Sequence, residues 1–179
     1  MRGLLDRDKL EALMRALGAA VRGPGRVYFT GGASALLEGW RNSTVDADLK
    51  LDPEPPGAFE ALRRLKDELD VNVELASPDD FLPPLPGWRE RSRFVARHGP
   101  VDFLHYDFFA QALAKIERGY DRDLEDVRAM LRRDLIQPVP LRRYFAAIEP
   151  ALVRYPQIDA DVFRHKLEEL LAEAPHGQD

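Results

Sequence analysis

The sequence predicts a mixed α/β protein of the α+β type, in which helices flank a small mixed β-sheet. Apolar residues recur at helical spacing in several segments, and short runs rich in β-branched and aromatic residues alternate with them. The 179-residue chain is 45% hydrophobic and 32% charged, as expected of a globular domain with a sizeable core. Together these observations predict helices packed on one sheet.

The first half of the chain predicts three helices and three strands in alternation. Residues 6–21 carry apolar side chains at helical spacing, and Gly23-Pro24-Gly25 ends that helix. The expected order from there is strand 26–30, helix 32–40, loop 41–44, strand 45–51, helix 57–70 and strand 71–75.

The second half predicts a hairpin and then helices. Strands over 94–97 and 101–106 flank His98-Gly99-Pro100, a turn sequence. Helices are expected over 107–118, 121–133 and, as two segments, 141–174, while Pro138 and Pro140 predict a linker. We therefore expect one domain over residues 1–136 and a helical C-terminal extension over residues 137–179.

Composition excludes several classes of function. The net charge of −5 argues against a general nucleic-acid coat protein. The absence of cysteine excludes disulfides, thiolate zinc sites and cysteine nucleophiles. No apolar run reaches membrane-spanning length, and the acidic N-terminal segment lacks a signal-peptide core, so a cytoplasmic protein is expected.

A glycine pair and an acidic pair form the motif that bears on function. Gly31-Gly32 opens a predicted helix, and Asp46 and Asp48 follow in a predicted strand. Side chains two residues apart in a strand point to the same side, so the two carboxylates share one face. A hard divalent cation would relieve their mutual repulsion. Backbone N–H groups at the helix start suit phosphate oxygens, so the motif predicts nucleotide chemistry.

These residues resemble the signature of the nucleotidyltransferase superfamily, which has the DNA polymerase beta-like fold. In that signature a glycine pair precedes two carboxylates separated by one residue. The longer pattern over residues 31–48 is similar to the bacterial branch that contains the AbiEii-type toxins. A second block, over residues 107–127, resembles the helix pair that follows the sheet in that branch. The likeness covers about residues 26–133.

The resemblance implies transfer of a nucleotidyl group from an NTP to an acceptor hydroxyl, with one or two Mg²⁺ ions as cofactor. Asp46 and Asp48 are then catalytic metal ligands. Gly31, Gly32 and Ser34 contact the β- and γ-phosphates. A toxin–antitoxin or phage-defence setting follows by analogy alone.

Glu74 is the preferred third catalytic metal ligand. It lies in predicted strand 71–75, with polar neighbours on its face, and this strand follows the one that carries the acidic pair. The family more often has Asp at this place. Asp102 and Asp107 are alternatives, and an exposed strand position without metal is an equally good interpretation of Glu74.

Lys115 and Arg118 are the predicted nucleotide-binding cations. One side of helix 107–118 is apolar, and the polar side carries residues at steps of three and four. Those residues are Gln111, Lys115, Arg118 and Arg122. The resemblance places a lysine near the triphosphate, and Lys115→Met is expected to weaken NTP binding with little effect on fold stability. A salt-bridge cluster with Asp123 and Asp126 is at least as good an interpretation.

Two further classes of function stay open. The chain could be a non-catalytic nucleotide-binding module of the same fold, or an antitoxin-like protein whose helices from Leu141 onward bind another protein. The expected partners are an NTP, an acceptor that is RNA, protein or a small molecule, and a protein partner in the last case. No membrane partner is expected.

Overall fold

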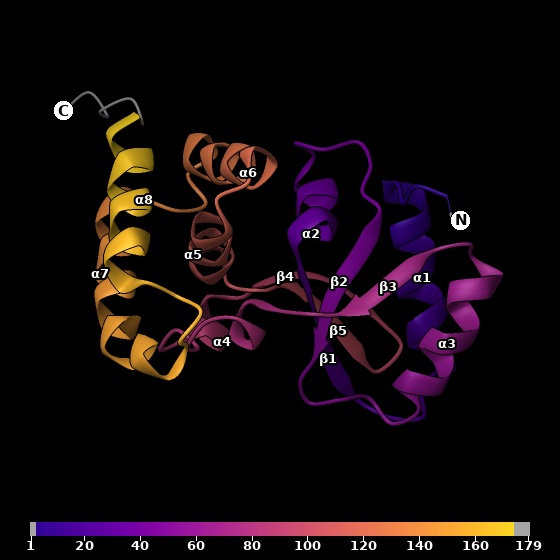
Figure 1. Cartoon of the computed structure of the whole chain (residues 1–179). Helices are drawn as coiled ribbons and strands as arrows, with labels where there is room; N and C mark the ends of the chain where they lie inside the picture. The colour runs from indigo at the N-terminus through magenta and orange to yellow at the C-terminus, as the bar shows by residue number, and fades with distance from the viewer. Residues whose placement is uncertain (1–2, 174–179) are drawn as a thin grey trace. The chain divides into compact units, whose positions relative to one another are not determined.

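The computed structural model describes residues 3–173, and its elements follow the predicted order (Figure 1). The helices are α1 (Arg7–Ala20), α2 (Gly31–Glu38), α3 (Ala58–Glu68), α4 (Trp88–Arg91), α5 (Phe108–Arg118), α6 (Asp121–Arg132), α7 (Pro138–Ile148) and α8 (Ala160–Glu173). The strands are β1 (Gly25–Thr30), β2 (Asp46–Leu51), β3 (Asn72–Leu75), β4 (Arg93–His98) and β5 (Val101–His105). Short 3₁₀ turns span Pro78–Asp80 and Glu149–Arg154. The predicted α+β class is confirmed.

The five strands form one mixed sheet in the order β3-β2-β1-β5-β4. β1 is central; it pairs antiparallel with β2 and parallel with β5. β3 lies parallel to β2 at one edge, and β4 closes the predicted antiparallel hairpin with β5 at the other. The acidic strand β2 therefore lies between the central strand and an edge strand.

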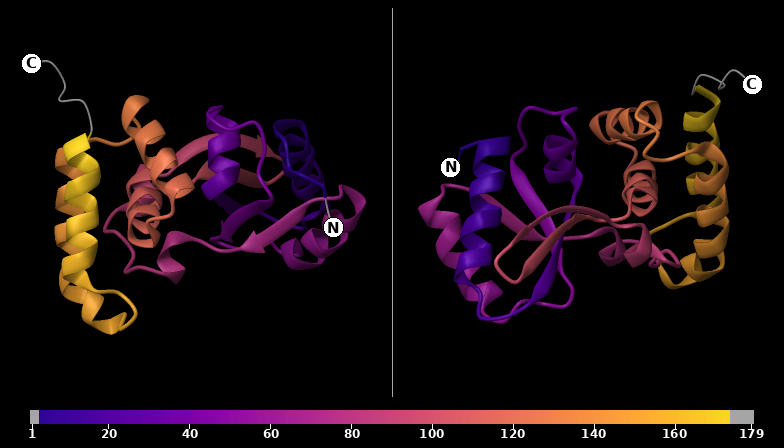
Figure 2. Two further views of the ribbon diagram at one scale, coloured as in Figure 1. Left: turned by 45° about the horizontal axis from the view of Figure 1, so that its top comes forward. Right: turned by 180° about the vertical axis from the view of Figure 1, so that it is seen from behind.

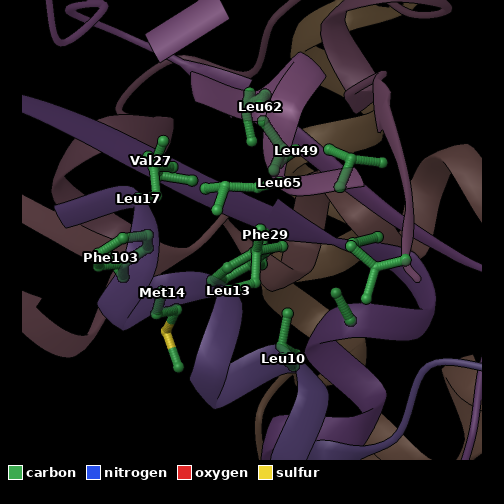
Figure 3. Close-up of a cluster of buried hydrophobic side chains, with 14 of the residues drawn as sticks. Leu10, Leu13, Met14, Leu17, Val27, Phe29, Leu49, Leu62, Leu65 and Phe103 are labelled. Atoms are coloured by element: carbon green, nitrogen blue, oxygen red, sulfur yellow. The ribbon is translucent and has the colours of Figure 1, made fainter. Parts of the chain in front are cut away.

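The apolar core lies between one face of the sheet and helices α1 and α3, which lie side by side in Figures 1 and 2. Figure 3 shows side chains from these helices and from β1, β2 and β5 meeting in this layer. They include Leu10, Leu13, Met14, Leu17, Val27, Phe29, Leu49, Leu62, Leu65 and Phe103. Because strand side chains alternate, this packing leaves the intervening polar residues of β2 and β3 on the opposite face.

Helix α1 has a defined contact near each end. Asp6 caps its N-terminus by accepting a hydrogen bond from the backbone N–H of Lys9 at 2.9 Å. Near its other end Gly18 approaches β4 so closely that a Cβ there would lie 2.3 Å from the carbonyl oxygen of His98. Only glycine permits this contact between helix and strand.

The described contacts divide the chain into two compact units. The sheet unit comprises Met1–Ser77 and Ser92–Tyr106, and the helical unit comprises Pro78–Arg91 and Asp107–Asp179. The predicted boundary at residue 136 does not coincide with this division, because α5 and α6 group with α7 and α8. Lys166 of α8, for example, donates a hydrogen bond to the carbonyl oxygen of Glu117 in α5 at 2.7 Å.

Within the helical unit, α7 and α8 run side by side in opposite directions (Figure 2). Phe145 of α7 packs on Phe163 of α8 with ring centroids 4.9 Å apart, and Tyr144 of α7 lies 5.0 Å from Phe109 of α5. The expected C-terminal helices are thus present; residue 174, their predicted end, lies outside the described residues.

The predicted linker at Pro138 and Pro140 is wrong. Both prolines belong to the first turn of α7. Proline fits there because the first N–H groups of a helix have no partner within the helix and the fixed φ angle of the ring is helical.

Within residues 3–173, no helix has both the length and the apolar character needed to cross a membrane.

Candidate functional site

The glycine pair lies where β1 passes directly into α2. Thr30 ends the strand and is the N-cap residue of the helix, and it makes no side-chain capping hydrogen bond. Gly31 has a φ of +56°, a conformation that side chains other than glycine rarely adopt. The sharp turn brings the first N–H groups of α2, which have no intrahelical partners, to the end of the central strand.

Gly31 also lies against the acidic strand. A Cβ on Gly31 would lie 3.1 Å from Oδ2 of Asp48. A bare glycine therefore leaves room beside this carboxylate, at the positive end of a helix dipole. The structure thus brings together two predicted site residues that lie seventeen positions apart in sequence.

Gly32 has a different reason to be glycine. A Cβ at this position would lie 2.1 Å from the side-chain oxygen of Thr44, in the loop before β2. Thr44 is in turn held by two backbone hydrogen bonds to Leu5, of 2.8 and 2.9 Å. Close packing of α2 on this loop explains Gly32 without a ligand, and its contact with phosphate stays a prediction.

The two aspartates share one face of the sheet, as the alternation in β2 predicts. Ala47 and Leu49 are buried in the core, whereas Asp46 and Asp48 are half-buried on the opposite side. Val45, the first residue of the predicted strand 45–51, precedes β2 instead, with a side chain 58% exposed. The alternation therefore begins one residue later than predicted.

Glu74 lies next to Asp48. β2 and β3 are parallel, and their register pairs Asp48 with Glu74 and Asp46 with Asn72. Paired residues of neighbouring strands point to the same face, so three carboxylates occupy two adjacent strands on one side of the sheet. Glu74 is exposed, and the amide of Asn72 donates a hydrogen bond to Oδ1 of Asp46.

Asp102 and Asp107, the two alternative candidates for the third metal ligand, form ion pairs with arginine side chains. Asp102 of β5 accepts a hydrogen bond from Nη2 of Arg97 at 3.0 Å, and this guanidinium lowers the pKa of the carboxyl group. Asp107 belongs to the helical unit, where it caps α5 by accepting from Phe109 N and pairs with Arg91 at 2.7 Å. Burial raises the pKa of Asp107, and Arg91 opposes that effect.

Ser34 takes part in an internal hydrogen-bond network. It is fully buried; its hydroxyl donates to the carbonyl oxygen of Phe29 at 3.1 Å and lies 3.0 Å from Nδ1 of His105. The other ring nitrogen of His105, Nε2, lies 3.0 Å from Oε1 of Glu38. The predicted contact of Ser34 with phosphate is untested, but its hydroxyl already has partners within the sheet unit.

Burial keeps His105 neutral near pH 7. Loss of hydration, aided by the positive charge of Arg93, lowers the pKa of His105 from 6.5 to about 4. Glu38 acts in the opposite direction, because a carboxylate favours the imidazolium form. Its side chain is 26% exposed and therefore partly hydrated, so the desolvation of the ring dominates.

The residues of the acidic face fit a hard cation by their chemistry. Mg²⁺ prefers oxygen ligands, and Asp46, Asp48 and Glu74 offer carboxylates from two neighbouring strands. Within residues 3–173, no three His, Asp or Glu side chains are grouped as a ready metal site. Ligation by all three carboxylates would thus require their side chains to rotate, and Mg²⁺ stays a prediction.

Lys115 is not on an exposed cationic face. Both Gln111 and Lys115 are buried, and the Lys115 ammonium lies 2.7 Å from Asp126 and 3.3 Å from Asp123. Arg118 pairs with Asp123 at 2.7 Å. The polar side of α5 is covered, because α6 packs its carboxylates against it. The inter-helix salt-bridge cluster is the arrangement found, and phosphate contact by Lys115 and Arg118 stays a prediction.

Sequence reasoning missed four residues that shape the site: Thr44, Asn72, Glu38 and His105. Glu38 follows Ser34 by four positions, one helical turn, which is a local signal. His105 gave no such signal, since 71 positions separate it from Ser34 and the pairing arises only when β5 lies beside β1.

No family model, curated protein or solved structure matches the chain.

Proposed function

We propose that the protein is an Mg²⁺-dependent nucleotidyltransferase. The observation that carries this proposal is the position of Asp48, which lies in register with Glu74 on one side and against Gly31, the first residue of α2, on the other. Carboxylates for a metal thus adjoin a helix N-terminus suited to phosphate. The likeness of residues 26–133 to the nucleotidyltransferase superfamily supports the same function.

The proposed reaction joins an acceptor hydroxyl to the α-phosphorus of an NTP. The acceptor oxygen forms a new P–O bond, the bond from the α-phosphorus to the bridging oxygen of the β-phosphate breaks, and pyrophosphate leaves with that electron pair. The acceptor proton passes to a carboxylate of the acidic face or to water. Bound Mg²⁺ would supply charge neutralisation of the triphosphate and a more acidic acceptor hydroxyl.

The residues of the chain have separate tasks in this proposal. Asp46, Asp48 and Glu74 hold the metal, and the amide of Asn72 orients Asp46 through its hydrogen bond. The N-terminal turn of α2 binds phosphate oxygens through backbone N–H groups. Glycine at position 31, with a φ of +56°, places no side chain at the start of that turn.

Label transfer tests this function. The protein is incubated with each of the four NTPs, labelled at the α-phosphate, together with Mg²⁺ and total RNA, a protein extract or small hydroxyl compounds as acceptors. We expect the label to enter one acceptor class, with pyrophosphate released in equal amount, and Asp48→Asn to abolish transfer.

Two other results have definite meanings. Mg²⁺-dependent nucleotide binding without label transfer would indicate the non-catalytic binding module. Label transfer that is unchanged in Asp48→Asn would exclude the acidic face as the site.

A further inference from the structure

We propose that His105 is a positioning residue, which holds the N-terminal turn of α2 in place through Ser34. The inference rests on the proposed function only for its effect on nucleotide binding. The positioning itself follows from contacts within the sheet unit. His105 ends β5, and its ring lies between two residues of α2 that are one helical turn apart, Ser34 and Glu38.

The contact between His105 and Ser34 affects the first turn of α2, because Ser34 lies directly after that turn begins. α2 follows β1 without any loop, so the first turn of the helix lies directly at the end of the central strand. Ser34 is the fourth residue of α2, directly after the turn that carries Gly31 and Gly32. Its hydroxyl ties the turn to β1 through Phe29 O and to β5 through His105 Nδ1. A shift of α2 would therefore break contacts with two strands at once.

Glu38 favours the tautomer of the His105 imidazole that can accept a hydrogen bond from Ser34. A neutral imidazole carries one N–H and one acceptor nitrogen. The Glu38 carboxylate accepts only, so it favours the proton on Nε2, 3.0 Å away. Nδ1 is then the acceptor, and the Ser34 O–H makes a three-centre hydrogen bond to Nδ1 and to the carbonyl oxygen of Phe29. Neutral His105 thus links the start of α2 to its last residue.

The same arrangement sets the gap beside Asp48. A Cβ on Gly31 would lie 3.1 Å from Oδ2 of Asp48, so a small rotation of α2 would close or open the space beside this carboxylate. On the far side of the turn, Gly32 leaves almost no room against Thr44. His105 thereby fixes the distance between the phosphate-binding turn and the acidic face.

Three substitutions of His105 separate positioning from space filling. Asn places an amide atom where Nδ1 lies, so it keeps the Ser34 contact. Gln reaches the place of Nε2 and keeps only the Glu38 contact, while Phe keeps the ring volume and neither contact. His98→Phe is the matched control, because His98 also lies on the hairpin and packs edge-on against Phe103.

Two measurements are made on each full-length variant: amide hydrogen exchange of residues 31–38, and titration with NTP and Mg²⁺. We expect His105→Asn and His98→Phe to behave like the parent. In His105→Gln and His105→Phe, exchange in α2 should quicken about tenfold and nucleotide affinity should fall about tenfold, the effect of one lost hydrogen bond. Exchange in α1 and α3 should not change.

The reverse order would overturn the proposal: if Phe preserves slow exchange in α2 and Asn does not, the ring only fills space. A second check is a double-mutant cycle between Ser34→Ala and His105→Phe, in which the two exchange effects should overlap rather than add. Additive effects would mean that His105 does not act through Ser34. If the parent binds no NTP, the proposed nucleotidyl transfer fails, and hydrogen exchange alone still decides the role of His105.

Discussion

Gly31 faces the carboxylate of Asp48: a methyl group on Gly31 would lie 3.1 Å from Oδ2 of Asp48. This close approach brings together the start of α2 and the middle of β2, two elements whose sequence motifs are separated by a loop. Glycine at residue 31 therefore has two reasons: the φ of +56°, and the space that it leaves beside the Asp48 carboxylate. The effect of the backbone conformation and the effect of the space beside Asp48 can be measured separately with glycine-to-alanine variants.

Gly31→Ala should therefore have two effects and Gly39→Ala only one. Both glycines have positive φ, but a Cβ on Gly39 would meet nothing within 4 Å. Each substitution should lower the free energy of unfolding by about 1 kcal/mol through backbone strain, measured by urea denaturation. Only Gly31→Ala should also weaken Mg²⁺-dependent nucleotide binding. Equal nucleotide affinity in the two variants would show that the space beside Asp48 is not used.

Asp48→Asn should stabilise the metal-free protein. Asp48 and Glu74 are neighbours across two parallel strands, and like charges in such a pair destabilise a sheet. Removing one charge should raise the free energy of unfolding by about 0.5 kcal/mol at low salt, and by less at high salt. Asp46→Asn is the control, because it also weakens the hydrogen bond from Asn72 and should give no gain. A gain of the same size in both variants would contradict the assigned register.

Lys115→Met should destabilise the fold, contrary to the expectation from sequence. The ammonium lies between Asp123 and Asp126 in a buried cluster, so its removal takes away the cation that compensates them. We expect a loss of about 3 kcal/mol in the free energy of unfolding. Arg118→Met should cost less than about 1 kcal/mol, because that side chain is 49% exposed. If Lys115→Met is as stable as the parent, the cluster does not hold α5 and α6 together.

Acid should weaken the fold through His105. Its pKa is about 4 in the folded protein and 6.5 in the unfolded chain, so between these values only the unfolded state binds the proton. The contribution is therefore complete above pH 6.5 and is lost as the pH falls toward 4. Between pH 7 and pH 5 the loss is about 2 kcal/mol. Urea denaturation of the parent and of His105→Asn at both pH values should show this extra pH dependence in the parent alone.

The sequence alone predicts those elements whose pattern of apolar and turn residues depends only on near neighbours in the chain. The period of α1, the alternation in β2 and the turn at His98-Gly99-Pro100 each predict the element found, because each depends on neighbours within a few positions. The predicted start of α7, at residue 141, is too late, because proline breaks a helix in its interior but is well tolerated in its first turn.

The site was predictable only in part. Shared orientation of Asp46 and Asp48 follows from the period of a strand, but the neighbour of Asp48 depends on which strand lies beside β2. That choice, β3, is a property of the whole sheet. The burial of Lys115 is likewise decided by the partner helix α6, and no pattern within α5 reveals it.

Calorimetric titration of each NTP into the protein, with and without Mg²⁺, tests the central claim most directly. The parent should bind at least one NTP measurably only when Mg²⁺ is present, and Asp48→Asn should lose that dependence because the metal loses a ligand. Absence of nucleotide binding in the parent, or the same Mg²⁺-dependent affinity in Asp48→Asn, would contradict the assignment of this face as a metal–nucleotide site.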